Sequence, residues 1–309
     1  MNNIPKHECI VCGSSQLLNL APYRYKHEMF AACNLCQCQA CQFVFANPMP
    51  DDKSLSNYNT SYFSNAHDGL PQDDLSVAYH SAINKLRAIY VEKNISINGV
   101  SKVLEIGGGA GYFAKYWKSK RPNTDYYMVE TDTSCHKVLE ELNVQLVERI
   151  EGLPGGVEFD LIVMSHVLEH TNSPFEFLSE MFKKLKKGGV IFVEVPCNDW
   201  KFKAEDEPHL LFFDKKSMKI LLEKVGFKQE ASSYYGESIK KLSSKSKLSH
   251  FLTKLRQKLL KHGIIFPFSS RQGDLESLEN PLESAAVKPF DAHIEKKSAS
   301  SWLRVIAVK

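Results

Sequence analysis

Short apolar runs alternate with amphipathic stretches in the middle of the chain, between about Lys102 and Tyr235. The apolar runs have the length of buried strands: VLEIG (103–107), YYMVE (126–130), DLIVMS (160–165) and VIFVEV (190–195). The stretches between them repeat their apolar positions at near-helical spacing. Such alternation predicts βαβ units, and therefore an α/β fold in which helices cover a parallel sheet.

Three helices are marked by their apolar spacing and by their ends. The first is expected over 73–90, where it leads into the α/β region. The second is expected over 173–188, with Ser173 as N-cap, Glu176 completing a capping box and a glycine as its stop. The third is expected over 215–226 and also ends in glycine.

The alternation stops after residue 236, so the chain divides by pattern into five segments. The final residues, WLRVIAVK (302–309), read as a strand. Because this strand follows a long insertion, we expect it to complete the sheet late, as an antiparallel edge strand. The segments are a cysteine-rich module (1–62), a helical linker (63–99), the α/β core (100–236), a basic insertion (237–300) and the final strand of the core (301–309).

A glycine-rich loop follows the first buried strand, in VLEIGGGAGYF (103–113). Glycine is needed where backbone approaches a ligand closely or adopts positive φ. The dinucleotide fingerprint G-x-G-x-x-G does not fit, because Tyr112 occupies its last position. A P-loop would require G-K-[ST], which is absent. The loop therefore does not predict a phosphate cradle.

This stretch closely resembles the loop of the class I S-adenosylmethionine-dependent methyltransferases, in which an acidic-x-G-x-G-x-G motif wraps the cofactor. The resemblance implies a Rossmann-like, seven-stranded methyltransferase sheet and S-adenosylmethionine as cofactor. It also implies that the acid ending the second strand accepts hydrogen bonds from the ribose hydroxyls, which suits a bidentate carboxylate. The matching cofactor residues are Glu105, Gly107, Gly109, Gly111 and, for the ribose, Glu130.

The resemblance extends over 100–235. FDLIVMSHVLEH (159–170) matches the fourth strand and its turn, which adds Ser165 and His166 to the expected cofactor contacts. PHLLFFDKKSMKILLEKVGF (208–227) matches the subgroup that contains many sugar and natural-product methyltransferases. The chain departs from the family at Lys187 and Gly108, where proline and cysteine are common, but neither position carries chemistry.

Six of the eight cysteines lie between Cys9 and Cys41. The pairs Cys9-x2-Cys12 and Cys38-x2-Cys41 have the spacing of a zinc ribbon, whose four thiolates form a tetrahedron. Cys33-x2-Cys36 is a rival for the second pair. The segment CQACQFVFANPMP resembles the N-terminal zinc-binding segment that precedes certain bacterial methyltransferase domains, which favours Cys38 and Cys41 and a structural zinc.

Two histidines are candidates for the proton transfer that methylation of a hydroxyl or C–H acceptor requires. His166 comes just after the fourth strand, at the carboxyl edge where open α/β sheets bind ligands. His209 follows the fifth strand and reaches the same edge. We rank His209 first as the base, because it belongs to the region that covers the acceptor in related enzymes. Each of the two could equally be structural, and His170 is expected to stabilise the turn.

Composition excludes several classes of protein. The net charge is +3, hydrophobic residues make up 43% and charged residues 24%, so a nucleic-acid partner is not required and disorder is not expected. No apolar run approaches the roughly 20 residues that span a bilayer, and the N-terminus lacks a signal sequence. Clustered, paired cysteines suggest a reducing compartment, so we expect a cytoplasmic protein.

The insertion begins with eight Lys or Arg and no acid over 238–263. Its second part, RQGDLESLENPLESAAVKPFDAHIEKKSASS (271–301), is polar and is expected to be loop-like. Within the first part an apolar helical stripe (Leu248, Phe251, Leu252, Leu255 and Leu259) lies opposite basic positions (Lys254, Arg256, Lys258 and Lys261). Two interpretations stay open. The stripe could pack on the domain, or the segment 239–262 could contact an anionic ligand or a membrane surface.

The leading prediction is therefore a cytoplasmic methyltransferase for a small or carrier-linked metabolite, with a sugar methylated at carbon or oxygen as one form. The alternative is an RNA methyltransferase whose zinc module recognises nucleic acid. It is disfavoured because MSHVLEH stands where an NPPF-type motif would be expected, and because the charge is near neutral. A non-enzymatic scaffold is disfavoured by the intact glycine loop and Glu130.

Overall fold

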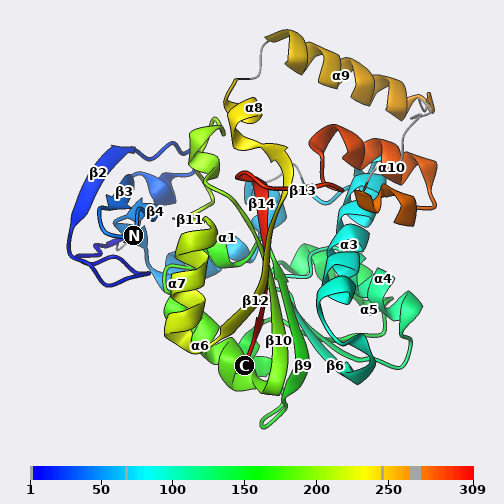
Figure 1. Ribbon diagram of the computed structural model, residues 1–309, viewed down its shortest axis with the longest axis horizontal. Coiled ribbons are helices and arrows are strands. Elements are labelled where there is room, and N and C mark those ends of the chain that lie inside the picture. The colour runs from blue at the N-terminus through cyan, green and yellow to red at the C-terminus, as the bar shows by residue number, and fades with distance from the viewer. Residues whose placement is uncertain (1–2, 67–68, 245–246, 265–272) are drawn as a thin grey trace.

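The central feature of the computed structural model, which describes residues 3–66, 69–244, 247–264 and 273–309, is an eight-stranded sheet (Figure 1). Its strand order is β13-β12-β14-β10-β9-β6-β7-β8. The strands are β6 (Lys102–Ile106), β7 (Asp125–Val129), β8 (Gln145–Val147), β9 (Phe159–Ser165), β10 (Leu185–Pro196), β12 (Lys228–Ser238), β13 (Glu295–Lys296) and β14 (Ser300–Val308). The expected seven-stranded, Rossmann-like sheet is thus present, with the two-residue β13 added at one edge.

Helices cover both faces of this sheet (Figure 1). On one face lie α3 (Asp74–Asn94), α4 (Tyr112–Lys120) and α5 (His136–Glu140). On the other lie α6 (Pro174–Lys184) and α7 (Lys215–Val225). Strands β6, β9 and β10 are buried on both faces, which explains why they read as continuous apolar runs. The predicted α/β architecture is therefore confirmed.

Strand β14 corrects the prediction of an edge strand. It runs antiparallel, as expected, but it pairs with β10 on one side and β12 on the other. Residues 303–307 are all buried, with Val305 in one core and Ile306 in the other. An edge strand keeps a row of unpaired backbone groups. A strand buried on both faces is better placed inside the sheet, where both backbone edges are paired.

The ends of α6 also differ from expectation. Ser173 is its N-cap residue, but its side chain makes no capping hydrogen bond, so the capping box with Glu176 does not form. The helix ends at Lys184, and Gly188 instead gives positive φ (75°) in the irregular start of β10. The helix over 215–226 is confirmed, since Gly226 ends α7 with φ of 110°.

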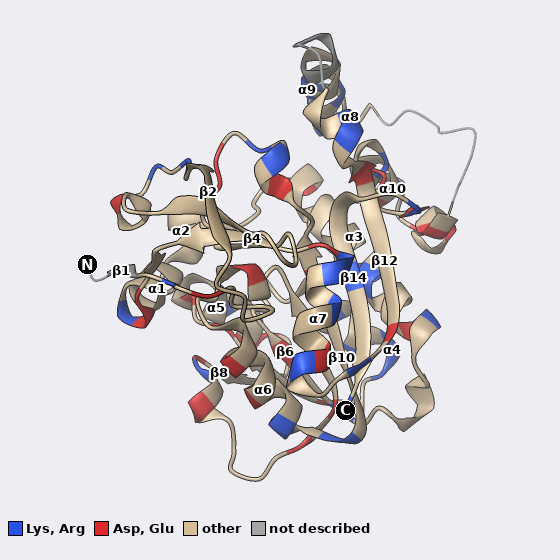
Figure 2. Ribbon diagram, turned by 60° about the vertical axis from the view of Figure 1, so that its left-hand side comes forward, with Lys and Arg blue, Asp and Glu red and all other residues tan. Residues whose placement is uncertain are grey.

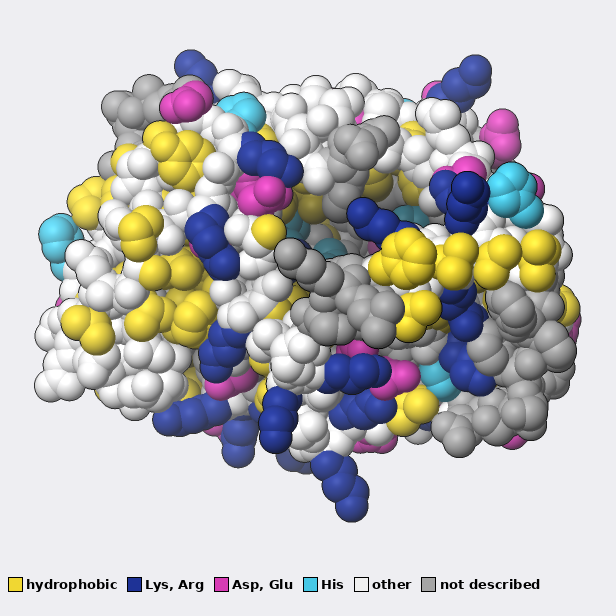
Figure 3. Space-filling model, turned by 90° about the horizontal axis from the view of Figure 1, so that it is seen from above, with side chains coloured by type: hydrophobic (Ala, Val, Ile, Leu, Met, Phe, Trp, Pro, Cys, Tyr) yellow, Lys and Arg dark blue, Asp and Glu magenta, His cyan; other side chains and the backbone are white. Residues whose placement is uncertain are grey.

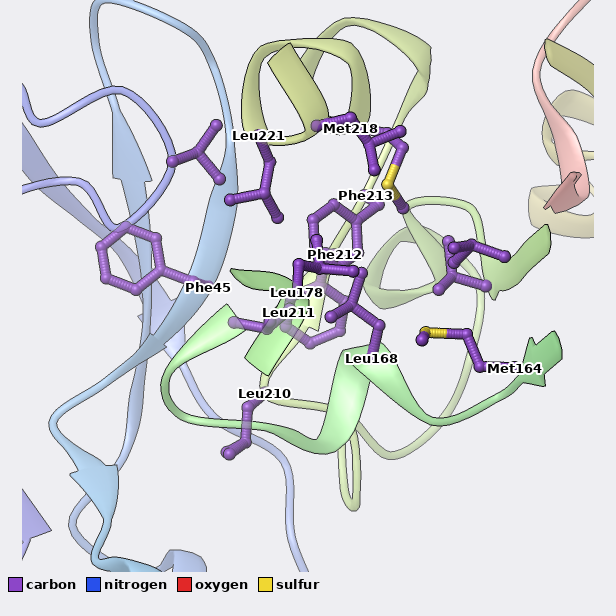
Figure 4. Packing of buried hydrophobic residues seen from close by; sticks show 14 of the residues in the cluster. Phe45, Met164, Leu168, Leu178, Leu210, Leu211, Phe212, Phe213, Met218 and Leu221 are labelled. Carbon is purple, nitrogen blue, oxygen red and sulfur yellow. The ribbon is translucent and has the colours of Figure 1, made fainter. Parts of the chain in front are cut away.

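The N-terminal module shares a sheet with the core. Strands β2 (Leu17–Pro22), β3 (Asn34–Cys38) and β4 (Val44–Asn47) form its meander, and β11 (Leu211–Phe212) joins their sheet from the core by pairing with β4. Figure 4 shows Phe45 of β4 beside Leu211 and Phe212 of β11. These two residues pack in the same buried cluster as Leu178 and Leu221 of the core. The module and the core are therefore joined by one continuous hydrophobic cluster.

The remaining elements of the module wrap this junction. The short strands β1 (Asn3–Ile4) and β5 (Met49–Pro50) pair antiparallel, and α1 (Asp52–Asn59) and α2 (Tyr62–Ala66) follow. Asp51 caps α1 by accepting a hydrogen bond from the Ser54 N–H. Helix α2 brings Tyr62 and Phe63 toward the carboxyl edge of the large sheet, where both contact residues of the core.

The insertion is more ordered than its polar composition suggests. It contains α8 (Ile239–Ser243), α9 (Lys247–Lys261) and α10 (Pro281–Val287), while residues 265–272 lie outside the described part of the chain. We predicted that the segment after α9 would be loop-like, which is wrong for α10. Its buried residues Ala285 and Val287 pack at α3, where Ile83 and Leu86 are buried. No described helix is long and apolar enough to cross a membrane.

Candidate functional site

The glycine loop lies between β6 and α4 and is tightly enclosed. Gly107, Gly109 and Gly111 have φ of 66°, 54° and 74°, in the left-handed region that favours glycine. A Cβ on Gly107 would lie 2.6 Å from Val167, and one on Gly111 would lie 2.4 Å from the Leu142 side chain. These glycines are therefore required by both conformation and space, which leaves the backbone of the loop exposed to a ligand.

Glu130 follows β7 and lies beside this loop. Its two carboxylate oxygens accept hydrogen bonds from the N–H of Gly109 (2.7 Å) and of Asp132 (2.8 Å). Burial raises the pKa of Glu130 and outweighs the two backbone hydrogen bonds, which lower it. A carboxylate offers about four lone-pair positions, so two remain for further donors. The geometry therefore fits the predicted role of accepting two ribose hydroxyls.

Asp132 was missed by the sequence analysis. Its side chain accepts a hydrogen bond from the Phe63 N–H (2.7 Å), and Phe63 lies over Gly109, within 3.3 Å of where a Cβ would stand. Helix α2 is thereby fixed as a cover over the glycine loop. No local signal marks this contact, because residues 63 and 132 meet only in the folded chain.

Glu105 lies within β6 and is 6% exposed, and its Oε2 accepts a hydrogen bond from the Tyr126 hydroxyl (2.7 Å). Burial raises the pKa of Glu105 to about 8. The Glu105 carboxyl is therefore largely neutral at pH 7 and is hydrogen-bonded inside the sheet. Its predicted contact with the cofactor stays a prediction.

We expect Glu105→Gln to stabilise the fold above pH 4.5. The pKa of Glu105 is 4.5 in the unfolded chain and about 8 in the folded protein. Below pH 4.5 both states are protonated, whereas between pH 4.5 and 8 only the unfolded chain ionises, so the free energy of unfolding falls as the pH rises. Glutamine keeps the acceptor for Tyr126 without the charge. The expected gain is about 4 kcal/mol at pH 8, measured by urea unfolding across pH. The exposed Glu158→Gln is the control, and an equal gain for it would contradict this explanation.

The end of β9 carries two further predicted residues. The Ser165 hydroxyl is buried and has no hydrogen-bond partner among the described residues, which suits a contact with a bound molecule. His166 adopts φ of 58°, a conformation that is strained for a non-glycine residue and is frequent at functional sites. The structure thus brings both residues to the carboxyl edge of the sheet, close to the glycine loop through Val167.

His166 lies between two buried carboxylates. Its Nδ1 is 3.3 Å from Glu169 and its Nε2 is 3.3 Å from Glu194. Burial lowers the pKa of His166, but the two glutamates outweigh it and raise the pKa above its ordinary value. Glu194 is itself held by Arg87 and Arg304 at 2.5–2.8 Å. When the His166 ring is protonated, it has no lone pair with which to accept another proton. His166 is therefore better suited to donating a hydrogen bond to an electron-rich group.

His209 has a different environment. Its side chain is buried, and its Nδ1 lies 2.7 Å from Oδ2 of Asp199. Asp199 also pairs with Lys203, at 2.9 Å, and these two partners lower its pKa against the effect of burial. A carboxylate that accepts the Nδ1–H fixes the tautomer of the ring, which leaves the lone pair on Nε2. Asp199 was missed because nothing in the local sequence links it to a histidine ten residues away.

Two polar side chains lie beside the His209 ring. Glu169, His170 and His209 each offer one ligand atom within 4.8 Å of the others. The His170 Nδ1 lies 3.2 Å from the carbonyl of Pro208, and its Nε2 is 3.4 Å from the Tyr62 hydroxyl. Burial lowers the pKa of His170 to about 4, so the ring is neutral. His170 thus ties the turn after β9 to the His209 segment, as the predicted turn role requires.

The N-terminal module holds the His209 segment from outside. The Tyr23 hydroxyl donates to the carbonyl of His209 (2.9 Å), and Arg24 forms an ion pair with the buried Asp206 (2.5 Å). The N–H groups of Lys26 and His27 donate to Glu207. Together with the pairing of β11 and β4, these contacts make the module part of the wall of the site.

The four predicted metal ligands come together in this module. Cys9, Cys12, Cys38 and Cys41 have sulfur atoms within 4.8 Å of one another, whereas Cys33 and Cys36 lie outside this group. Cys9 and Cys41 are 3.6 Å apart, and Cys12 and Cys38 are 3.5 Å apart. Tetrahedral zinc with bonds of about 2.3 Å places sulfurs about 3.8 Å apart. The cluster therefore fits a structural zinc ion.

Residues 76–232, slightly more than half of the chain, match a family model described as a methyltransferase domain. No curated protein matches the sequence significantly. Similar solved structures include an S-adenosylmethionine-dependent methyltransferase from Archaeoglobus fulgidus (18% identity, TM-score 0.46, covering 74% of this chain and 94% of that one). Coclaurine N-methyltransferase is similar at 18% identity (TM-score 0.46, 74% and 72%), and the plantazolicin methyltransferase at 14% (TM-score 0.44, 84% and 90%). Because the family model covers more than half of the chain, the chain belongs to this methyltransferase-domain family.

Proposed function

We propose that this protein transfers the methyl group of S-adenosylmethionine to a hydroxyl or acidic carbon of a small or carrier-linked acceptor in the cytoplasm, and that the acceptor is a sugar. The observation that carries the proposal is the buried His209–Asp199 pair at 2.7 Å, at the same edge of the sheet as the glycine loop. A base and a cofactor loop at one edge are what methylation of a weakly nucleophilic acceptor requires.

The residues at the loop supply the groups that the cofactor needs. Glu130 retains lone pairs for two ribose hydroxyls beside the N–H groups of Gly109 and Asp132. The unpartnered hydroxyl of Ser165 lies at the end of the adjacent strand. When bound, S-adenosylmethionine supplies an electrophilic methyl group on a sulfonium centre. The protein's own contribution is to hold the acceptor in line and to accept its proton.

The proton is assigned to Nε2 of His209. Because Asp199 accepts the Nδ1–H and stays ionised, it stabilises the imidazolium that forms when Nε2 takes a proton from the acceptor. S-adenosylmethionine held at Glu130 and the glycine loop would supply the methyl carbon to the acceptor atom, and the electron pair of its carbon–sulfur bond would pass to sulfur. His166, held between Glu169 and Glu194, is proposed to bind an acceptor oxygen rather than remove its proton.

The polarity of the site favours a sugar over an apolar natural product. Glu169 and His170 lie beside His209, and the Tyr62 hydroxyl lies 3.4 Å from the His170 ring. The Glu169 carboxylate is buried, with Oε1 beside the His166 ring at 3.3 Å and Oε2 without a hydrogen-bond partner among the described residues. Buried acceptors of this kind are costly unless a ligand satisfies them. A polyhydroxylated acceptor supplies such donors.

The test is calorimetric titration of S-adenosylmethionine, followed by methyl-transfer assays on nucleotide-linked sugars and on RNA. We expect one cofactor site per chain and methylation of a sugar. Methylation of RNA with no activity on sugars would favour the alternative function. Absence of cofactor binding would overturn the whole proposal.

Glu130→Ala should weaken S-adenosylmethionine binding by about 1.5–3 kcal/mol, since hydrogen bonds to a charged group are worth this much. Because the substitution also removes the acceptor for the Gly109 N–H, Glu130→Gln is a useful second variant that keeps one acceptor oxygen. We expect it to bind with intermediate affinity by calorimetry. Glu140→Ala, at an exposed acid on α5, is the control. Wild-type affinity in Glu130→Ala would remove Glu130 from the site.

A further inference from the structure

Helix α9 lies at the periphery of the molecule (Figure 1), and a row of hydrophobic side chains is visible on the surface there (Figure 3). Phe251, Leu252 and Leu255 are 61%, 53% and 43% exposed, and Ile264 just beyond the helix is 47% exposed. Half of the eight large hydrophobic side chains that are exposed in the described residues thus lie within 251–264. The side chain of Leu248, the predicted start of this stripe, lies outside the described part of the chain.

The helix packs on the protein through a different face. Leu260 is buried, and Arg256 turns inward to donate to the carbonyl of Ala285 on α10 (3.3 Å). Lys261 reaches Asp73 at the start of α3 (3.3 Å). Our interpretation that the stripe packs on the domain is therefore wrong for its central residues. Leu260, Arg256 and Lys261 attach the helix to the rest of the protein, whereas the central residues of the stripe face solvent.

Basic side chains flank the exposed stripe. Lys254 and Lys258 are exposed and are spaced one turn apart, so they lie along one side of Phe251 and Leu255. Figure 3 shows a row of hydrophobic side chains along α9 with Lys and Arg beside it, and Figure 2 shows basic residues on α8 and α9. No acidic residue occurs from 239 to 264. The helix thus has an anchoring face, an apolar face and a basic face.

We propose that α9 docks the protein onto a lipid bilayer with anionic headgroups, lying in the plane of the interface. Phe251, Leu252 and Leu255 enter the boundary of the acyl chains, and Lys254 and Lys258 bind the headgroup phosphates. Charge complementarity favours this occupant over a second copy of the chain. A symmetric contact through α9 would bring the same lysine flank of both copies together, which is repulsive. An isolated apolar stripe of this size would otherwise be unfavourable on a protein surface.

Vesicle flotation with the full-length protein tests this proposal. We expect the protein to float with vesicles of phosphatidylcholine containing about 30% phosphatidylglycerol, at least tenfold more than with phosphatidylcholine alone. Binding should fall strongly in about 0.5 M salt, since the charge attraction is screened. Equal recovery with both vesicle types, or none with either, would overturn the proposal.

Paired variants separate the two faces of the helix. Phe251→Ala with Leu255→Ala should reduce binding at least about tenfold, and Lys254→Gln with Lys258→Gln about tenfold to thirtyfold. The matched controls are Leu18→Ala, at an exposed leucine of the N-terminal module, and Lys216→Gln with Lys219→Gln on α7, which should bind as wild type. Circular dichroism and basal methyl transfer on a soluble acceptor check folding. Light scattering that shows a dimer lost in the α9 variants, without vesicle binding in wild type, would instead assign the face to a second copy.

Discussion

We expect Cys9→Ser or Cys41→Ser to remove the zinc ion and loosen the N-terminal module, and we expect the wild-type protein to contain about one zinc per chain. Structural zinc sites of this kind contribute about 10–16 kcal/mol of binding free energy to folding, so this is the largest effect that we expect of any single substitution. The four sulfurs already lie within 4.8 Å of one another. Metal analysis and near-ultraviolet circular dichroism measure the loss.

Cys33→Ser and Cys36→Ser are the matched controls. Both thiols are buried in the same module but lie outside the cluster of four, so their variants should keep the metal. Loss of zinc in these variants and retention in Cys9→Ser would exchange the ligand assignment. Protein purified without chelator that holds no zinc and has all thiols free would refute the metal site itself.

Loss of the metal should also reduce turnover, although none of the four metal ligands takes part in the proposed chemistry. The module holds the His209 segment through Tyr23, through the Arg24–Asp206 ion pair and through the pairing of β4 with β11. We therefore expect the zinc-free variants to retain S-adenosylmethionine binding better than turnover. The glycine loop and Glu130 belong to the core sheet, whereas the position of His209 depends on the module.

His209→Ala is expected to lower turnover roughly 10²–10⁴-fold, the usual worth of a general base. Cofactor affinity should change little, because the glycine loop and Glu130 hold that ligand independently. Asp199→Asn should give a smaller loss and an altered pH profile, since it disturbs the tautomer without removing the imidazole. Single-turnover kinetics across pH, with calorimetry of the cofactor, separates these effects.

His166→Ala is the control with the same ring on the neighbouring strand end. If it abolishes turnover while His209→Ala is nearly normal, the two roles must be exchanged. If both variants stay active, the acceptor is a better nucleophile that needs no protein base, such as a thiol or a neutral amine. Inactivation by a chelator that magnesium or manganese reverses would instead make the Glu169, His170 and His209 group a cation site.

The sequence alone determined the local features of this protein. Four apolar runs became β6, β7, β9 and β10, because a strand buried on both faces must be apolar along its whole length. The glycine loop and the paired cysteines were equally predictable, since positive φ and metal-ligand spacing are imposed within a few residues. The family and its cofactor follow from these short motifs.

Only the tertiary structure decided which distant segments meet. Strand β14 is paired on both sides because β10 and β12 lie next to it in the folded sheet. Strand β11 pairs with β4 of the N-terminal module rather than with a strand of the large sheet. The same holds for the Asp199–His209 pair and for the outward stripe of α9. Periodicity shows that a helix has an apolar face, but it does not show whether that face meets protein or solvent. That depends on the partners that long-range packing provides.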